Sequence, residues 1–316
     1  MRCGLLAGQR HPASQPPGLV AEGVHILHGK LQVAATRRLQ RGAHIPADGF
    51  FILYAGADSM IRITIKVMTQ VKKDQEIFYI GTSGWTYDDW EGRFYPAGLA
   101  RSHWFEYYSN QFSTVEVNAT FYRTFKDDTY LGWKSKAPKD FRYVLKAPRT
   151  ITHQKNLIDV EDDIKNFVRS ALLLADLLGM ILLQVAPSTP YDLKRLKQAL
   201  LAFPDPSIVA VEFRNPDWLS TQTETLLRDL GASFCNADSP TQKLTRVLTS
   251  KRAYIRMHGR RKWYSDFYGD DELLEIANIA RDLARRGASE VYVFFNNDYF
   301  ANACVNAKSL LKLLAI

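Results

Sequence analysis

The chain has 316 residues, 46% of them hydrophobic and 23% charged, and a formal net charge of +8. This composition is that of a globular protein long enough to bury a large core, and no apolar run approaches the roughly 20 residues that a membrane helix needs. Cys3, Cys235 and Cys304 are odd in number and far apart, which argues against a disulfide framework and predicts a cytoplasmic location. The N-terminus lacks an apolar segment with a small-residue cleavage site, so no secretory signal is predicted.

Residues 1–76 differ in character from the rest of the chain. They open with the turn-rich stretch RHPASQPPGL and continue with short apolar runs that follow no period. They carry 10 Lys and Arg against 5 Asp and Glu, whereas residues 77–316 carry 31 against 28. We expect 1–76 to be a poorly ordered N-terminal extension, disordered or not native, because Met60 or Met68 could start a shorter chain. A mitochondrial presequence is the alternative, which the acidic residues and the Pro cluster disfavour.

From residue 77 onward, short β-rich runs alternate with longer helix-compatible segments. The β-rich runs lie at 78–85, 114–122, 142–148, 180–187, 208–215, 232–238, 253–259 and 291–298. The helical segments lie at 100–111, 127–136, 160–178, 190–203, 219–230, 240–250, 270–286 and 301–315. Eight strand–helix units predict a parallel (β/α)8 barrel of the TIM type, formed by 77–316 as a single domain. The alternative is a doubly wound sheet, but no GxGxxG or P-loop follows any strand.

Residues typical of helix ends support this count of helices. Asp159 and Asp270 precede helical segments and are predicted to cap their N-termini. Gly179, Gly231 and Gly287 follow helical segments and are predicted to end them.

Most of the predicted strands end in polar residues spaced two apart, so their side chains share one face. The C-terminal ends of barrel strands form the active face of such folds. The candidate residues there are Glu116, Asn118, Lys146, Gln184, Glu212, Arg214, Arg256, His258 and Asn296. Each has a structural interpretation when taken alone, since buried Glu and Arg pair with each other and Lys146 can be a solvated strand end. Their convergence from most of the strands favours a functional site.

The residue types at these strand ends favour an anionic ligand over a metal ion. Glu116, Glu212 and His258 can ligate metals, but Arg256 and Arg214 lie beside them and would repel a dication. Guanidinium groups bind phosphate or carboxylate instead. Arg260 lies in the loop 259–262 after the seventh strand, where barrels often hold phosphate. We therefore predict no cofactor and disfavour a divalent metal without excluding it, with Glu116 or Glu212 as general base and His258 as general acid or oxyanion partner.

The chain also resembles the YecE-like family, a family of unknown function with a TIM-barrel fold. The segments that carry the resemblance are GTSGWTYDDWEGRFYP, FSTVEVNATFYR, FRYVLKAPRTITH, LLQVAP, VEFRNPDW, YIRMHGR and VYVFFNND, which together span most of 78–316. The resemblance implies the barrel but no settled chemistry. The family's barrel is similar to those of endonuclease IV and xylose isomerase, and this similarity suggests DNA binding. The strand ends here are poorer in His and richer in Arg than the three-metal site of endonuclease IV.

Three functional hypotheses follow from these patterns. The first is an enzyme, a hydrolase or a lyase, that acts on a small anionic or phosphorylated substrate by acid/base chemistry at the C-terminal face. The second is a nucleic-acid-binding protein or nuclease that uses Arg260, Arg261, Lys262 and the aromatic neighbours Trp263 and Tyr264. The third is a non-catalytic barrel with a structural or partner-binding role. The near-balanced charge of 77–316 favours the first over the second, and no GxSxG motif supports a serine hydrolase.

Overall fold

The computed structural model describes residues 77–315 continuously, and before them only six short strands. These are β1 (Gly4–Ala7), β2 (Leu19–Val20), β3 (Val24–Leu27), β4 (Lys30–Val33), β5 (Phe51–Tyr54) and β6 (Met60–Ile61). The chain divides into two compact units, Met1–Lys73 and Asp74–Ile316. The prediction that 1–76 is a disordered or non-native extension concerns residues that lie mostly outside the described part.

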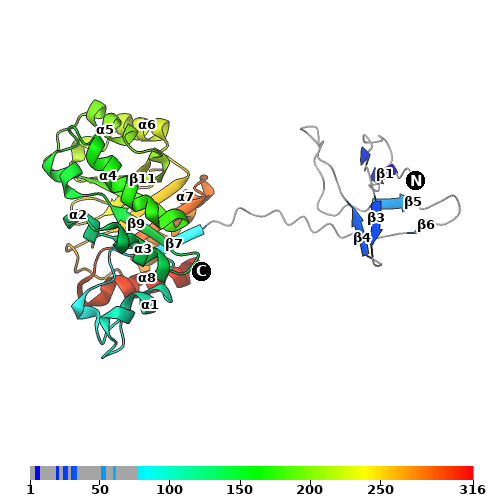
Figure 1. Cartoon of the computed structure of the whole chain (residues 1–316), viewed down its shortest axis with the longest axis horizontal. Helices are drawn as coiled ribbons and strands as arrows, with labels where there is room; N and C mark the ends of the chain where they lie inside the picture. The colour runs from blue at the N-terminus through cyan, green and yellow to red at the C-terminus, as the bar shows by residue number, and fades with distance from the viewer. Residues whose placement is uncertain are drawn as a thin grey trace. The chain divides into compact units, whose positions relative to one another are not determined.

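The second unit is a parallel eight-stranded barrel, which confirms the predicted fold (Figure 1). Its strands are β7 (Ile77–Thr82), β8 (Thr114–Val117), β9 (Arg142–Lys146), β10 (Leu178–Val185), β11 (Val209–Phe213), β12 (Ser233–Asp238), β13 (Arg252–Met257) and β14 (Glu290–Phe295). From β8 to β14 each strand pairs with the next in the sequence, and β14 pairs with β7. This order is the one expected when each strand is followed by a helix that crosses over to the neighbouring strand.

The barrel wall is nearly closed, and its weakest join lies between β7 and β8. Strand β7 pairs with β14 over six residues in register, but it meets β8 through the single bridge from Ser83 to Glu116. Gly81 lies at this join, and a Cβ there would stand 2.3 Å from the carbonyl oxygen of Thr114. The missing side chain at position 81 is therefore what allows the two strands to approach.

Helices connect the strands in the predicted order. They are α1 (Trp104–Ser109), α2 (Ala119–Tyr122), α3 (Asp127–Lys136), α4 (Glu161–Ala171), α5 (Leu193–Leu201), α6 (Thr221–Leu230), α7 (Asp270–Arg285) and α8 (Asn302–Leu314), with short 3-10 or π segments between some of them. The predicted helix 240–250 is absent, and these residues form an irregular connection instead. The predicted strand 114–122 ends early, because Thr120 turns the chain by donating its hydroxyl to the carbonyls of Val117 and Lys146.

The predicted helix ends are partly correct. Gly231 ends α6 with a left-handed backbone, φ 73°, as predicted. The cap of α7 is Gly269, whose N–H donates to the side chain of Glu272 at 2.9 Å, so the prediction of Asp270 as the cap is wrong. Asp159 makes no capping bond to α4, and Gly179 lies inside β10 rather than after a helix.

Buried apolar side chains fill two regions of this unit. The larger region lies between the strands and the surrounding helices. The smaller one lies inside the barrel and consists of Tyr79, Val144, Met180, Leu182, Ala210, Cys235, Tyr254, Tyr292 and Phe294. The polar residues discussed below continue the same inward faces toward the C-terminal ends of the strands. Within the described residues, no helix combines the length and the apolarity that crossing a membrane requires.

Candidate functional site

A buried network of charged side chains lies inside the barrel above the apolar layer. Strands β8, β11 and β13 contribute Glu116, Glu212 and Arg256, and none of these side chains is more than 1% exposed. Arg256 joins the two carboxylates, because its Nη2 lies 2.6 Å from Glu116 Oε1 and its Nη1 donates to Glu212 Oε2. The alternation of side chains along each strand brings these residues to the interior, as the sequence pattern predicts.

Glu116 is held by three donors, two of them from β13 and one from the residue that follows β7. Besides Arg256, the Ser83 hydroxyl donates to Oε1 at 2.7 Å and the Tyr254 hydroxyl donates to Oε2 at 2.6 Å. Sequence reasoning did not assign these two residues to the site. Tyr254 lies two positions before Arg256 on β13, so the same period-2 rule identifies it. It resembled an ordinary core aromatic, which concealed the role of its hydroxyl.

Glu212 has even more partners. Gln184 Nε2 donates to Oε2 at 3.1 Å, Arg214 Nε lies 2.5 Å from Oε1, and His258 Nε2 lies 3.1 Å from the same oxygen. Burial alone would raise the pKa of Glu212, but the guanidinium groups of Arg214 and Arg256 outweigh it and hold the pKa well below its usual value. Glu212 is therefore an ionised hydrogen-bond acceptor at neutral pH.

His258 is neutral in this environment. Its complete burial, opposed by Glu212 and reinforced by Arg256, lowers its pKa to about 4. The Asn296 amide nitrogen lies 3.0 Å from Nδ1, and Arg214 Nη2 lies 3.0 Å from Nε2. When Asn296 donates to Nδ1, the neutral ring carries its proton on Nε2 and donates it to Glu212, so Nε2 does not accept a hydrogen bond from Arg214.

Lys146 lies at the end of β9, beside this network but outside its hydrogen bonds. The residue is 7% exposed, and its Nζ lies 4.0 Å from the centre of the Phe121 ring. Nζ forms no hydrogen bond and no ion pair with any residue of 78–315. Burial, reinforced by the positive charge of Arg256, lowers its pKa from 10.5 to about 8. Lys146 thus lies at a strand end, as predicted, but most of its surface is buried.

The rim above the network carries further polar and aromatic groups. Arg214 is 14% exposed, and its guanidinium carbon lies 4.8 Å from the centre of the Trp263 ring. Half-buried Asn118 has a buried Oδ1 with no hydrogen-bond partner. The pKa of His153 is lowered by burial and then by the charge of Lys146, which indicates a positive potential at this end of the barrel. The rim is thus cationic and in contact with solvent.

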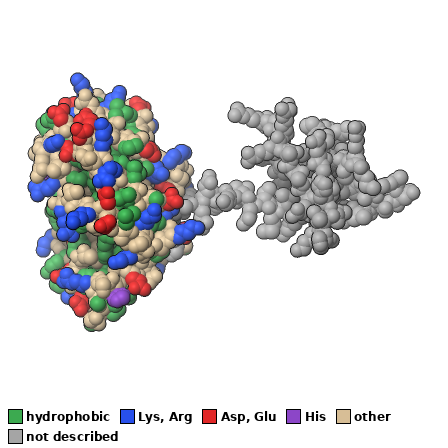
Figure 2. All heavy atoms as spheres, viewed as in Figure 1, with side chains coloured by type: hydrophobic (Ala, Val, Ile, Leu, Met, Phe, Trp, Pro, Cys, Tyr) green, Lys and Arg blue, Asp and Glu red, His purple; other side chains and the backbone are tan. Residues whose placement is uncertain are grey.

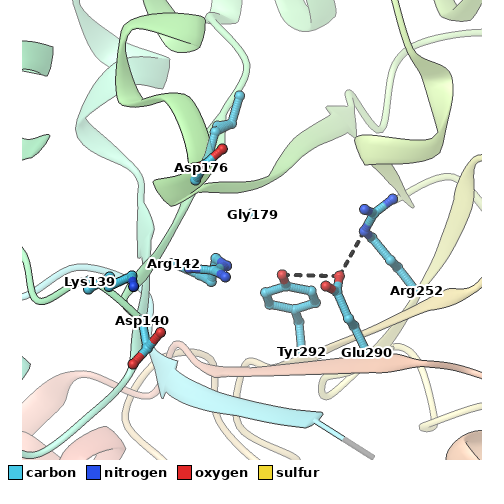
Figure 3. Close-up of a pocket in the computed structure, with 9 residues that line it drawn as sticks. Lys139, Asp140, Arg142, Asp176, Gly179, Arg252, Glu290 and Tyr292 are labelled. Atoms are coloured by element: carbon cyan, nitrogen blue, oxygen red, sulfur yellow. Dashed lines mark hydrogen bonds and ion pairs between the residues drawn. The ribbon is translucent and has the colours of Figure 1, made fainter. Parts of the chain in front are cut away.

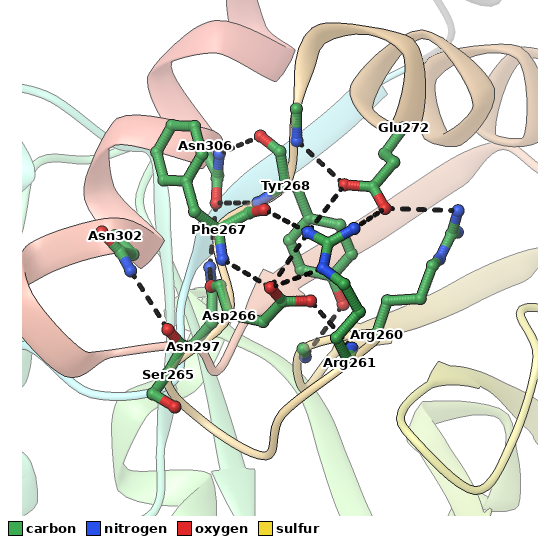
Figure 4. Close-up of polar contacts among 12 residues, drawn as sticks. Arg260, Arg261, Ser265, Asp266, Phe267, Tyr268, Glu272, Asn297, Asn302 and Asn306 are labelled. Carbon is green, nitrogen blue, oxygen red and sulfur yellow. Dashed lines mark hydrogen bonds and ion pairs between the residues drawn. The ribbon is translucent and has the colours of Figure 1, made fainter.

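The loop after β13 does not form the expected phosphate site. Arg260 donates to Asp238 at 3.0 Å and to Glu275 at 2.9 Å. Arg261 donates to Asp266 and Glu272 (Figure 4). These acidic partners, two of them from α7, neutralise the charges of Arg260 and Arg261, which the sequence suggested as ligand-binding groups. The structure thus places Arg260 in an ion-pair cluster and not among the groups around Arg256.

The surface gives no support for a dense basic stripe either. On the face shown in Figure 2, Lys and Arg side chains are interspersed with Asp and Glu. Trp263 packs against Arg214 and His258, so its ring is engaged within the protein. Tyr264 beside it is 45% exposed. The nucleic-acid hypothesis stays a prediction that neither this face nor this loop supports.

A separate cavity opens at the opposite, N-terminal end of the barrel. It has a volume of about 460 Å³ and is lined by residues at the beginnings of β9, β10, β13 and β14 (Figure 3). Its cations and acids are mixed, and Arg252 donates to Glu290 at 2.7 Å. In TIM-type barrels this end serves stability rather than catalysis. The C-terminal end therefore remains the candidate functional site.

Within residues 78–315, no three His, Cys, Asp or Glu side chains converge in a way that could hold a metal ion. The nearest approach to such a group, around Glu212 and His258, is occupied by Arg256 and Arg214. The predictions that no cofactor is used and that a metal is disfavoured stay predictions.

Comparison with known proteins places the chain in a family. The family model described as "Protein of unknown function DUF72" matches residues 79–316. The chain belongs to the DUF72 family. This confirms the resemblance stated from the sequence, because relatives of this DUF72 protein include the UPF0759 protein YecE of Escherichia coli K12. That relative is 31% identical over 158 residues, which cover 49% of this chain and 55% of YecE.

Other matches cover a larger share of the DUF72 protein. The UPF0759 protein YunF of Bacillus subtilis 168 is 27% identical over 275 residues, 76% of this chain and 95% of YunF. The crystal structure of a DUF72 family protein from Thermotoga maritima is 31% identical with a TM-score of 0.69, and the match covers 76% of this chain and all of that one. A DUF72 family structure from Enterococcus faecalis, 20% identical with a TM-score of 0.67 over 76% of this chain and 96% of that one, shares the fold.

Proposed function

We propose that this DUF72 protein is an enzyme that acts on a small anionic substrate by acid/base chemistry at the C-terminal end of the barrel. One observation carries the proposal: Lys146 is a buried cation without a carboxylate partner, next to the charged network. A buried, unpaired ammonium group destabilises a fold, so packing gives no reason for its presence. An anionic ligand would supply the missing counter-charge. Lys146 is thus best explained as a group that meets a substrate.

The geometry changes the roles that the sequence suggests. Both Glu116 and Glu212 are saturated with donors, so we assign them to holding Arg256 and, for Glu212, His258 as well. Lys146 is better suited to transfer a proton, because its pKa of about 8 lies close to neutral pH. Arg214 on the rim would bind the anionic group of the substrate.

Three amides complete the proposed site. Gln184 lies in β10, and Asn118 and Asn296 directly follow β8 and β14. We propose that these amides orient the substrate by hydrogen bonds. Asn118 Oδ1 is free to accept one, since it has no partner in the structure. The proposed enzyme class is a hydrolase or a lyase, and the proposed location is the cytoplasm. The buried free thiols of Cys235 and Cys304 are compatible with a reducing compartment.

The test is to find a ligand and follow its conversion. A panel of small carboxylates and phosphate monoesters is screened by thermal shift and then by NMR for turnover. We expect at least one anion to raise Tm and to be converted, with both effects reduced at least tenfold in Lys146→Gln and Arg214→Gln. Arg142→Gln, at the opposite end of the barrel, is the control and should behave as wild type. Absence of stabilisation by every anion would reject the proposal.

The second candidate function is a non-catalytic barrel that binds a ligand or partner. The observation in its favour is that Glu116, Glu212, Arg256 and His258 are fully buried and paired with one another, as a purely structural network would be. The same experiment separates the two candidates. Anions that raise Tm but are never converted would favour this second function.

A further inference from the structure

We propose that Lys146 forms a covalent imine with the carbonyl carbon of a small 2-oxo carboxylate. This inference rests on the proposed function and deepens it by naming the substrate class and the reacting atom. It starts from three observations on adjacent strands: an unpaired amine on β9, an amide donor on β10 and a partly exposed guanidinium at the end of β11.

The first observation is the surroundings of the amine. Lys146 Nζ faces the Phe121 ring at 4.0 Å and forms no ion pair with Glu116 or Glu212, although both carboxylates lie in the same network. An amine attacks a carbonyl only in its neutral form, and desolvation together with a neighbouring cation is a known way to produce that form. Burial and Arg256 provide both conditions here, and the lowered pKa agrees with them.

The second observation is the position of the groups that could bind a carboxylate. Lys146 pairs with Leu182 in the sheet, and Gln184 lies two residues further along β10 with its side chain on the same face. Arg214 lies above Gln184, since Gln184 pairs with Glu212. The backbone of Lys146 therefore lies one inward-facing level below that of Gln184, and Arg214 follows one level above Gln184. A carboxylate bound by Arg214 would direct an adjacent carbonyl carbon downward toward Lys146.

The third observation is the charge of the site. Glu116 and Glu212 are matched by Arg256 and Arg214, which leaves Lys146 as the uncompensated positive charge. The carboxylate of a 2-oxo acid restores neutrality when the amine is charged. It also offsets the positive charge of a protonated imine after reaction. A neutral ketone or aldehyde lacks this compensation, so the site should favour the anionic carbonyl compound.

The covalent step balances without any oxidant or cofactor. The nitrogen lone pair of neutral Lys146 forms a bond to the carbonyl carbon, and the π electrons of the carbonyl move to its oxygen. The oxygen takes up the two protons that the nitrogen loses and leaves as water, and a carbon–nitrogen double bond forms. The reverse reaction with water releases the free lysine. The imine draws electrons from the neighbouring carbon–hydrogen or carbon–carbon bonds, which is how amine catalysis activates such compounds.

The test is reductive trapping of the full chain with pyruvate and sodium cyanoborohydride, followed by peptide mass mapping. We expect one reduced pyruvate on Lys146, formed at least ten times faster than on the exposed Lys139. Arg214→Gln should slow trapping by pyruvate about tenfold more than trapping by acetone, the effect of losing one charged hydrogen bond, because loss of the Arg214 charge alters the Lys146 amine equally for both compounds. Lys146→Met should abolish the specific adduct.

Two results would overturn the imine. One is labelling of Lys146 no faster than that of Lys139. The other is equal trapping of pyruvate in wild type and Arg214→Gln. Thermal-shift measurements with pyruvate and with inorganic phosphate are run in parallel. They distinguish rejection of imine formation from rejection of the proposed function. Stabilisation without an adduct rejects only the imine, whereas the lack of stabilisation by any anion rejects the enzyme proposal as well.

Discussion

Lys146 shows how a single residue can oppose the stability of the fold that holds it. Its amine is buried beside Arg256 without a counter-ion, and the difference between a pKa of 10.5 and about 8 corresponds to about 3 kcal/mol of destabilisation when the amine is charged. The charged amine of Lys146 therefore lowers the free energy of unfolding. Functional residues commonly carry such a cost, because groups that must meet a ligand cannot be satisfied within the protein.

Lys146→Met should stabilise the protein at pH 7. Methionine keeps an unbranched side chain of similar length and removes the charge. Because the pKa of Lys146 is lower in the folded state, the unfolded chain binds more protons between pH 8 and 10.5, and wild-type stability rises with pH across that window. We expect a gain of about 1–3 kcal/mol at pH 7 that shrinks by pH 9.5. Urea unfolding at both pH values measures it, and a gain that is the same at both would contradict it.

Glu212→Gln should have the opposite effect on stability. The change leaves Arg256 and Arg214 buried without their shared carboxylate, and breaking a buried ion pair costs about 3–5 kcal/mol. The matched control is Glu290→Gln, which breaks the partly exposed pair with Arg252 at the other end of the barrel and should cost about 1 kcal/mol or less. Equilibrium unfolding in urea at pH 7 compares the two. Losses of equal size would show that the network does not hold the barrel together.

For single residues, the sequence predicts whether a side chain faces the barrel interior, but it does not predict which residue that side chain contacts. Strand alternation correctly brings Glu116, Glu212 and Arg256 to the barrel interior, because that placement depends only on local geometry. The loss of Arg260 to an ion-pair cluster depends on Glu275, which lies 15 residues further along on another element. The Lys146 amine lies over the ring of Phe121, which comes from α2, 25 residues earlier in the chain. Neither contact can be predicted from the spacing of residues within a single strand or helix.

Among the strands and helices, too, features set by the local sequence are predicted, whereas features set by contacts between distant residues are not. The alternation of β-rich and helical segments predicts all eight strands of the barrel, since burial on both faces demands apolar runs. It does not predict that β8 ends at Val117, because Thr120 ends the strand with hydrogen bonds to β8 and to β9. It also does not predict the weak join between β7 and β8, which depends on Gly81 meeting Thr114.

Gly81→Ala tests this join. The added methyl group would stand 2.3 Å from a backbone oxygen, so β7 must move away from β8, and we expect a loss of about 3 kcal/mol or more. Gly132→Ala in α3 is the control, since a Cβ there meets no atom within 4 Å and should stabilise the helix by about 0.5–1 kcal/mol. Chemical unfolding measures both changes. A Gly81→Ala protein as stable as wild type would show that the join is not tight.

For the whole molecule, the main question is what the barrel needs from the rest of the chain. The family model begins at residue 79, and the second compact unit begins at Asp74. The described strands and helices of this unit account for the complete parallel sheet and its cover. The barrel thus contains its own core, as an independently folding domain does.

A chain that starts at Asp74 should therefore fold on its own. We expect its main thermal transition to lie within about 3 °C of that of the full chain, a shift that corresponds to roughly 1 kcal/mol for a domain of this size. Calorimetry of both chains measures the difference, with far-UV circular dichroism as a check on the helix and strand content. A much lower transition, or a chain that does not fold, would show that residues 1–73 stabilise the barrel.

The pairing of β7 also determines when the barrel can be completed during protein synthesis. This strand is the first of the barrel to leave the ribosome, but its six-residue partner β14 is the last. Until about residue 295 has emerged, the only barrel strand available to pair with β7 is β8, which it meets through a single bridge. Its apolar residues stay exposed through most of translation, at the stage when nascent chains are prone to aggregate. Chaperones that bind short apolar segments would therefore find their target at the start of this barrel.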